Sequence, residues 1–427
     1  MSPPPRHRPG RPYLSAPPLR QSEEAAEGAE VIRELPGPDG IVLAGALRDL
    51  TLWLDTPADE RGALFTADAA ARRTAQIKLS QIEEALWVPV FTLSTIAEDP
   101  ANVAQSRLLY ACRRIVSWAE ERGRPATKLA FTQAAALLSP DDATLALEVA
   151  KLAREAADHA RAESWFRHTV RLSRRNDWEN YVWAYVGLGV LYIHAGNLAA
   201  ASTVMQRALR AAVRHRLRPL SGVAHHHLFH LAAEAGKPRS AAEHIVAALN
   251  AYGPDHPRLP YLVSDVAWFW LQVGKPRPAL ALFERVLVAL TNPNERTMVS
   301  ANSTWAAAVA CERIQYERMR ERTLAFAQEA QGRAYLDHAY TALAYADIHM
   351  QEWERAADTA KQALTLALAT GNAEARYKAG VLRDSALAQA LPSRKLSTIE
   401  GEEFTRQTEK LAGELLAALQ PVVVATR

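Results

Sequence analysis

Glycine recurs at nearly equal spacing in the middle of this chain, each time between two stretches with the apolar pattern of a helix. Gly196, Gly236 and Gly274 follow one another at intervals of 40 and 38 residues. A period of this length with two helical stretches per unit is typical of a solenoid, in which each helix pair buries its apolar face against the next. The spacing therefore predicts an all-α repeat array, and the hydrophobic fraction of 49% suffices for burial along it.

The most complete unit of this array lies at residues 182–215. It carries Tyr185, Leu188, Gly189, Tyr192, Gly196, Ala201, Met205, Ala208 and Leu209. This succession of aromatic, Leu-Gly, aromatic, turn glycine, small, large apolar and Ala-Leu residues resembles the tetratricopeptide repeat (TPR). The small residues allow two helices to cross closely, and the turn glycine ends the first helix in a left-handed cap. The resemblance implies a right-handed superhelical α-solenoid of antiparallel helix pairs.

The same register extends from this unit in both directions and covers residues 109–391 in about seven units. The unit at 298–336 is degenerate, and we place its helices at 305–311 and 319–330 mainly from the spacing. Units of 38–40 residues are longer than the usual TPR. In this respect the array resembles the repeat regions of bacterial signal-responsive regulators and of kinesin light chains.

Three further segments flank the array. Residues 1–39 are rich in proline and arginine, which predicts a disordered leader. Residues 40–108 contain helical apolar stripes at 41–54 and 67–86, which we interpret as N-terminal capping helices. Residues 392–427 are expected to form a C-terminal capping helix and tail.

The composition excludes several classes of protein. The two cysteines, Cys112 and Cys311, lie in helical patterns without a partner at a metal-ligand spacing, so we expect two small buried hydrophobes. The sequence contains no apolar stretch of about 18 residues and no signal-peptide core, which favours a cytoplasmic protein without membrane contact. It also lacks a glycine-rich phosphate loop and a nucleophile elbow, so we predict no enzymatic activity and no cofactor.

The resemblance to TPR proteins also implies a binding groove, because ligands of that family usually lie in the concave surface formed by the first helix of each pair. Position by position, the groove residues are Trp183, His194, His226, His230, Tyr261, Ser264, Trp268 and Tyr345. Aromatic and histidine side chains with few paired basic residues favour a peptide or partner helix. We therefore predict a scaffold or adaptor whose partner is a protein or peptide, with self-association through the array ends as a further possibility.

The sequence His225-His226-His227-Leu228-Phe229-His230 is the most unusual part of this groove. His226 and His230 stand on one helix face, but two imidazoles alone do not form a zinc site. A third ligand, His194 or Glu234, would have to be brought in by folding. We therefore predict polar groove residues and no metal site, with a pH-sensitive contact as the alternative.

Positive charge is concentrated between residues 161 and 218, a segment that contains ten arginines and only three acidic residues. Most lie on the second helix of a pair or in the following turn, which places them on the outer face. This candidate basic face consists of Arg167, Arg171, Arg174, Arg175, Arg210 and Arg214. A solvated surface, an acidic protein partner and a nucleic acid remain alternative interpretations.

Two regulatory alternatives also remain open. The first is a sensor that binds a small molecule or signal peptide and controls a separate transcription regulator. The second is DNA reading by residues 71–81, which combine arginine, glutamine and lysine. That segment lacks the glycine turn between two short helices that a helix-turn-helix motif requires, so we do not favour it.

Overall fold

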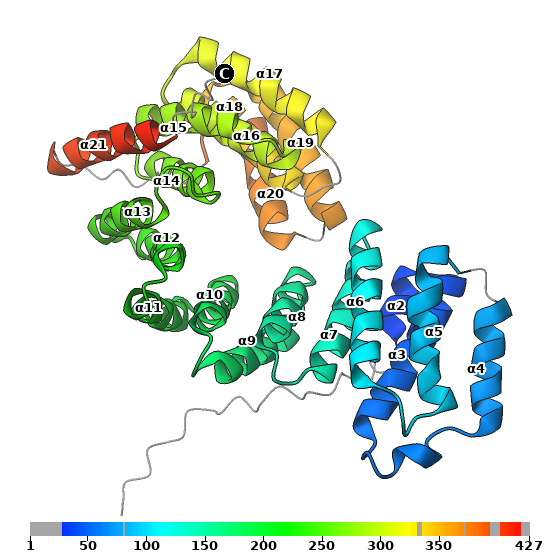
Figure 1. The fold of residues 1–427 in the computed structure, drawn as a ribbon. Coiled ribbons are helices and arrows are strands. Elements are labelled where there is room, and N and C mark those ends of the chain that lie inside the picture. Colours follow the sequence, from blue (N-terminus) through cyan, green and yellow to red (C-terminus); the bar gives the residue numbers. More distant parts are fainter. Residues whose placement is uncertain (1–27, 80–81, 331–334, 371, 393–401, 420–427) are drawn as a thin grey trace, which may run out of the picture. The chain divides into compact units, whose positions relative to one another are not determined.

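The computed structural model describes residues 28–79, 82–330, 335–370, 372–392 and 402–419. These residues form helices α2 to α21 and one short 3-10 helix, with no strand among them, which confirms the predicted all-α fold (Figure 1). The chain divides into two compact units, residues 1–220 and 221–427. No helix in the described part is long and apolar enough to span a membrane.

The first unit consists of an N-terminal bundle and three helix pairs. The bundle contains α2 (Ala29–Glu34), α3 (Pro38–Asp55), η1 (Arg61–Ala63), α4 (Ala67–Leu79) and α5 (Glu84–Glu98). The pairs are α6 (Gln105–Glu121) with α7 (Pro125–Leu138), α8 (Ala143–Glu155) with α9 (His159–Ser173), and α10 (Trp178–His194) with α11 (Leu198–Arg214).

The second unit continues with four helix pairs and two closing helices, and its first helix begins just before the unit boundary. The pairs are α12 (Arg218–Glu234) with α13 (Pro238–Tyr252), α14 (Leu259–Gln272) with α15 (Pro276–Ala289), α16 (Pro293–Val309) with α17 (Arg313–Glu329), and α18 (Leu336–His349) with α19 (Trp353–Thr370). The closing helices are α20 (Ala373–Leu387) and α21 (Glu402–Ala418), of which α21 packs against α13 and α15. The described residues thus contain seven helix pairs.

All seven pairs turn through one residue with a positive φ angle. Four turns use glycine, at Gly123, Gly196, Gly236 and Gly274. The other three place Ala157, Cys311 and Gln351 in the same conformation, with φ of 59°, 59° and 60°. In each of these three turns the next amide N–H donates a hydrogen bond five residues back, as Glu312 does to the Ala307 carbonyl at 2.9 Å. The same backbone turn therefore forms with and without glycine.

This regularity corrects the predicted position of the degenerate unit. Its first helix begins at Pro293 and not at residue 305, and its second begins at Arg313. Cys311 is consequently the turn residue and is exposed, contrary to the expectation of a buried hydrophobe. Cys112 is buried as expected, and desolvation raises the pKa of its thiol to about 12.

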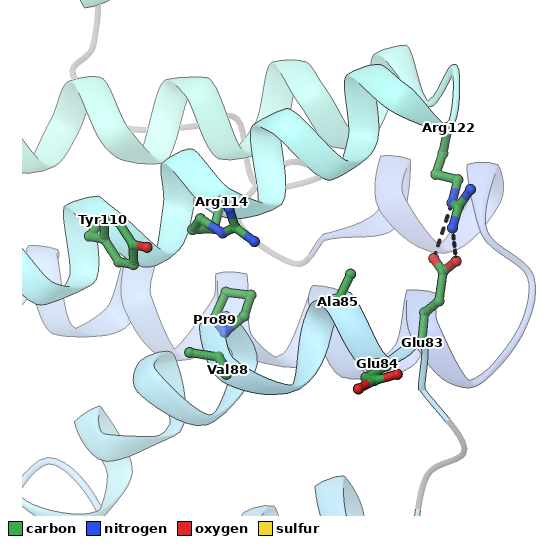
Figure 2. Close-up of a pocket in the computed structure, with 8 residues that line it drawn as sticks. All are labelled: Glu83, Glu84, Ala85, Val88, Pro89, Tyr110, Arg114 and Arg122. Carbon is green, nitrogen blue, oxygen red and sulfur yellow. Dashed lines mark hydrogen bonds and ion pairs between the residues drawn. The ribbon is translucent and has the colours of Figure 1, made fainter.

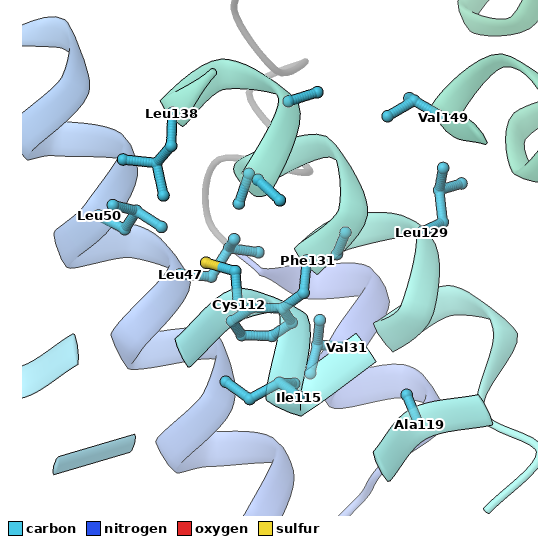
Figure 3. Packing of buried hydrophobic residues seen from close by; sticks show 14 of the residues in the cluster. Val31, Leu47, Leu50, Cys112, Ile115, Ala119, Leu129, Phe131, Leu138 and Val149 are labelled. Carbon is cyan, nitrogen blue, oxygen red and sulfur yellow. The ribbon is translucent and has the colours of Figure 1, made fainter. Parts of the chain in front are cut away.

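The predicted leader extends too far into the chain. Residues 1–27, like residues 393–401 and 420–427 of the predicted tail, lie outside the described part, but α2 already begins at Ala29. Its Val31 is fully buried beside Ile115 and Phe131 of the first helix pair (Figure 3). The Glu34 carboxylate accepts the Ala126 and Thr127 amides at 2.8 Å and so caps α7, whose own N-cap supplies no side-chain bond.

The predicted helix over residues 67–86 is likewise corrected. Helix α4 ends at Leu79, and a separate helix, α5, begins at Glu84 and includes Pro89 in its second turn. Within α4, the Arg73 guanidinium forms a two-point ion pair with Asp49 of α3, with N–O distances of 2.7 and 2.8 Å. An arginine held in this way packs the bundle and is not directed outward for DNA contact.

A buried ion cluster joins three helices near the end of the second unit. The carboxylate of Asp347 on α18 is inaccessible to solvent and accepts hydrogen bonds from Tyr316 and Arg320 of α17, at 2.6 and 2.8 Å. Thr359 of α19 donates to the same carboxylate at 2.8 Å. Because every partner is polar and well aligned, the cluster fixes how these helices pack.

Candidate functional site

Aromatic residues occupy the same register position on successive first helices of the second unit. His230, Trp268, Trp305 and Tyr345 lie on α12, α14, α16 and α18, each six residues before the turn residue of its pair. The rings of Trp268 and Trp305 meet edge to face at 5.2 Å between centroids, and Trp305 stacks on Tyr345 at 4.7 Å. We call these four residues the A-helix row.

The row is open at one end and buried at the other. Trp305 and Tyr345 are 2% and 8% exposed, whereas Trp268 is half-buried and the His230 side chain is 37% exposed. Beside Trp268 on α14, Tyr261 is 44% exposed and donates a hydrogen bond from its hydroxyl to Glu295 at 2.9 Å. This hydrogen bond and partial burial raise the pKa of Tyr261. The accessible part of the row therefore lies on α12 and α14.

Two buried polar atoms beside the row have no hydrogen-bond partner within the described residues. They are the indole Nε1 of Trp305 and the amide Oδ1 of Asn302, both on α16. Leaving such a group unsatisfied costs about 1–3 kcal/mol. These two atoms therefore require a partner other than the described side chains to be satisfied.

At the open end of the row, folding brings a carboxylate to the predicted histidine pair. The Oδ2 atom of Asp265 on α14 lies 2.8 Å from His226 Nε2 and 3.0 Å from His230 Nε2. The predicted third group, Glu234, lies on the same helix and acts on His230 only through its charge. Asp265 was missed because it lies about one repeat away from the pair, 39 residues after His226 and 35 after His230, and belongs to no motif.

Mutual charge and burial set the protonation of this cluster. Burial raises the pKa of Asp265, but the charge of His230 and hydrogen bonds from both imidazoles outweigh it and hold that pKa below its ordinary value. Burial lowers the pKa of His226 despite its bond to Asp265. Burial also lowers the pKa of His230, but Asp265 reverses the effect and raises it overall. Of the two imidazoles, His230 is therefore the one whose protonated form the carboxylate favours.

The remaining predicted groove residues lie on α10 of the first unit. Trp183 is half-buried, with the Lys151 ammonium 5.1 Å from its ring centroid, a distance that allows a cation–π contact. His194 is exposed at the end of the helix and meets His159 edge to face at 6.4 Å. Because Trp183 and His194 stand at separate ends of α10, they do not form one cluster.

The predicted basic face is accessible in the first unit. Its exposed members, on α9, α11 and the turn after α9, are Arg171, Arg174, Arg175, Arg210 and Arg214. Arg167 differs, because it is half-buried and donates to Glu163 at 2.8 Å and to the Tyr192 hydroxyl at 2.7 Å. It therefore holds α9 to α10 and contributes little free charge to the face.

A surface pocket of about 820 Å³, which the sequence did not indicate, lies between α5 and α6 (Figure 2). Its lining residues are Glu83, Glu84, Ala85, Val88, Pro89, Tyr110, Arg114 and Arg122. An ion pair between Glu83 and Arg122 closes one end, while Val88 and Tyr110 are 69% and 60% exposed. The hollow is therefore an open, mixed surface and not an enclosed reaction site.

No family model matches the chain, and no curated protein sequence matches it. Among solved structures, the Signal Transduction ATPase with Numerous Domains (STAND) protein with a tetratricopeptide repeat sensor from Pyrococcus horikoshii aligns with a TM-score of 0.53 and 12% identity. The alignment covers 94% of this chain and 61% of that protein. The APC/C hetero-tetramer Cut9-Hcn1 aligns with a TM-score of 0.48 and 14% identity, and the alignment covers 81% of this chain and 63% of that one. BtubC from P. vanneervenii aligns with a TM-score of 0.40 and 17% identity, and the alignment covers 53% of this chain and 92% of BtubC.

The comparison with the STAND protein shows the fold. The chain is a TPR-like helical repeat protein, as the predicted resemblance implied. It spans about three fifths of that protein's length, and at 12% identity the likeness concerns the fold alone.

Proposed function

We propose that the protein is a non-catalytic interaction scaffold that binds a peptide or partner helix at the open end of the A-helix row. The observation that carries the proposal is the row itself, in which aromatic rings recur at one register on successive first helices. Rigid, partly exposed aromatic side chains supply contact area at low entropic cost and dominate many protein interfaces.

The chemistry at the open end defines the partner. Trp268 offers an apolar face, Tyr261 an exposed ring with a polar tip, and Ser264 a half-buried hydroxyl on the same helix. The His230 and Asp265 pair adds polar groups beside the rings. Such a surface suits a segment with one or two apolar anchors flanked by polar side chains, as in a helix-in-groove complex.

The test is affinity capture from the protein's own cell lysate with a double variant, Tyr261→Ala and Trp268→Ala. Hot-spot aromatic residues typically contribute about 2 kcal/mol or more each, so capture should fall at least 30-fold. Tyr377→Ala is the matched control, because Tyr377 lies on α20 and is 74% exposed. The same protein recovered equally with wild type and the double variant contradicts binding at the row.

A sensor of small molecules or signal peptides is the second candidate, and the observation that favours it is the likeness to the STAND protein with a TPR sensor over 94% of this chain. A sensor is stabilised by its signal, since a ligand that binds only the native state raises the free energy of unfolding. A protein-free extract that raises the melting temperature of wild type, and equally that of the double variant, supports this candidate over the scaffold.

Nucleic-acid contact through the basic face is the third candidate, supported by the exposure of five of its six arginines. Binding that depends on phosphate contacts weakens steeply as salt rises. Replacing Arg210 and Arg214 with glutamate should abolish such binding, whereas the variants at Tyr261 and Trp268 should leave it intact. Binding that is insensitive to salt excludes this candidate.

A further inference from the structure

We infer that His226, His230 and Asp265 form a binding site for one divalent transition-metal ion of the Zn²⁺ type, linking α12 to α14. The three donor atoms, two imidazole Nε2 atoms and a carboxylate oxygen, all lie within 4.8 Å of one another. Imidazole and carboxylate are ligands that zinc and related ions accept. The inference does not depend on the proposed function.

The spacing of the donors is close to what a bound ion requires. Zinc bonds to nitrogen and oxygen measure about 2.0–2.1 Å, so ligand atoms around a tetrahedral ion stand about 3.3 Å apart. Asp265 Oδ2 already lies 2.8 and 3.0 Å from the two imidazole nitrogens. To hold the ion, each of these two distances would lengthen by a few tenths of an ångström, while the two imidazole nitrogens, which lie within 4.8 Å of each other, would come to the same separation of about 3.3 Å.

The histidines are held in the arrangement that metal binding needs. His226 and His230 are four residues apart on α12, and their rings lie 5.2 Å apart with an interplanar angle of 21°, so both Nε2 atoms approach the same carboxylate. The other ring nitrogen of His226, Nδ1, lies 3.4 Å from the Tyr252 hydroxyl. This hydroxyl donates when Nε2 carries the proton and accepts when a metal occupies Nε2, so it supports both states.

The charges around the site have mixed signs. The carboxylate of Asp265 neutralises half the charge of a divalent ion, and Glu234 lies near enough to act on His230. Arg258 acts in the opposite direction, because its charge reaches His226 and His227. It is the two imidazole donors that favour a transition metal over Mg²⁺ or Ca²⁺, which depend on several carboxylate or carbonyl oxygens.

Three protein ligands leave a coordination position open. The side chains of His230 and Asp265 are 37% and 38% exposed, so this position is reached from solvent at the open end of the A-helix row, whereas His226 is 8% exposed. Zinc sites with three protein ligands typically hold a water molecule or an external ligand in the fourth position.

The site is tested by titrating the chelator-treated full chain with Zn²⁺ in a calorimeter, and with Co²⁺ followed by visible absorption. We expect one ion per chain. His230→Asn and Asp265→Asn each remove one ligand with little change in size and should weaken binding about 100-fold or more. Tyr252→Phe should weaken it about 10-fold, in the range for groups that orient a metal ligand.

The neighbouring histidine pair provides a matched control. His225 on α12 and His244 on α13 place their Nδ1 atoms 3.0 Å apart. Among the described residues, no third possible ligand forms a metal-binding group with these two histidines. His244→Asn should leave Zn²⁺ affinity unchanged. Unchanged far-ultraviolet circular dichroism establishes that each variant is folded. A wild-type chain that binds no stoichiometric Zn²⁺, or His230→Asn and Asp265→Asn variants that bind it as tightly as wild type, overturns the site.

Discussion

The three turns with a residue other than glycine at the positive-φ position provide a direct test of how the repeat is built. We predict that Cys311→Gly stabilises the second unit and that Gly236→Ala, at the equivalent turn of another pair, destabilises it by a similar amount. Both residues have a positive φ, 59° and 64°. The Cys311 side chain is exposed, and a Cβ atom added to Gly236 would meet nothing within 4 Å. The two substitutions therefore change the free energy of unfolding in opposite directions, and both act only through the backbone conformation.

The magnitude follows from two opposing contributions. A non-glycine residue in the left-handed region costs about 1–2 kcal/mol. Glycine lowers that cost but gives up about 0.5–1 kcal/mol through the larger conformational entropy of the unfolded chain. The expected net change in the free energy of unfolding is about 0.5–1 kcal/mol, positive for Cys311→Gly and negative for Gly236→Ala.

Urea unfolding of the full chain, followed by circular dichroism, measures both changes. The midpoint should rise for Cys311→Gly and fall for Gly236→Ala at an unchanged dependence on denaturant, with melting temperatures moving by about 1–4 °C. Because the two turns are far apart in the array, the double variant should lie close to wild type. Two changes of the same sign would refute the argument that the left-handed backbone sets the preference for glycine.

Further predictions concern packing, the buried ion cluster and pH. Gly187→Ala should destabilise the first unit by about 1–2 kcal/mol in thermal unfolding, because its Cβ would lie 2.2 Å from the buried Phe166 ring. Gly380→Ala, whose Cβ would meet nothing within 4 Å, should stabilise the second unit by up to about 1 kcal/mol. Asp347→Ala should cost about 3–5 kcal/mol in urea unfolding by leaving the largely buried Arg320 guanidinium without its carboxylate, and a loss below about 1 kcal/mol would contradict this. Burial lowers the pKa of His349 in the native state. As the pH falls below about 6.5, this histidine therefore becomes protonated in the unfolded chain before it does so in the native state. The free energy of unfolding should therefore fall between pH 7.5 and 5.5, and His349→Gln should reduce that fall; an equal fall in both proteins would disprove this contribution.

The sequence predicted the repeat where the pattern depends on few residue types. Glycine at the left-handed turn and small residues at the helix crossing are visible in the sequence, and the fold follows from them. At Cys311 and Gln351 the same turn forms with the same backbone hydrogen bonds but without glycine, so the sequence carries no sign of it. Helix α5 was missed for a different reason, because Pro89 lies inside it and proline in a sequence normally indicates that a helix ends or kinks.

The candidate site was only partly predictable. The TPR register located Trp268 and His230, and the same offset from the turn residue identifies Trp305 once Cys311 is recognised as a turn. Asp265 had no such signal, because an isolated aspartate on an apolar helix acquires its meaning only from the helix packed beside it. Contacts between repeats depend on how the helices stack, and this information is spread over many core residues.

Site-specific photocrosslinking tests binding at the A-helix row most directly. A photoreactive phenylalanine analogue is placed at Tyr261, beside the open end of the row, or at Tyr377 on α20, which is the more exposed of the two. Each protein is irradiated in the lysate of its own cells. Our account predicts one prominent crosslinked partner from position 261, lost with Trp268→Ala, and no such product from position 377. A partner that crosslinks only at 377, or at 261 regardless of Trp268, would contradict it.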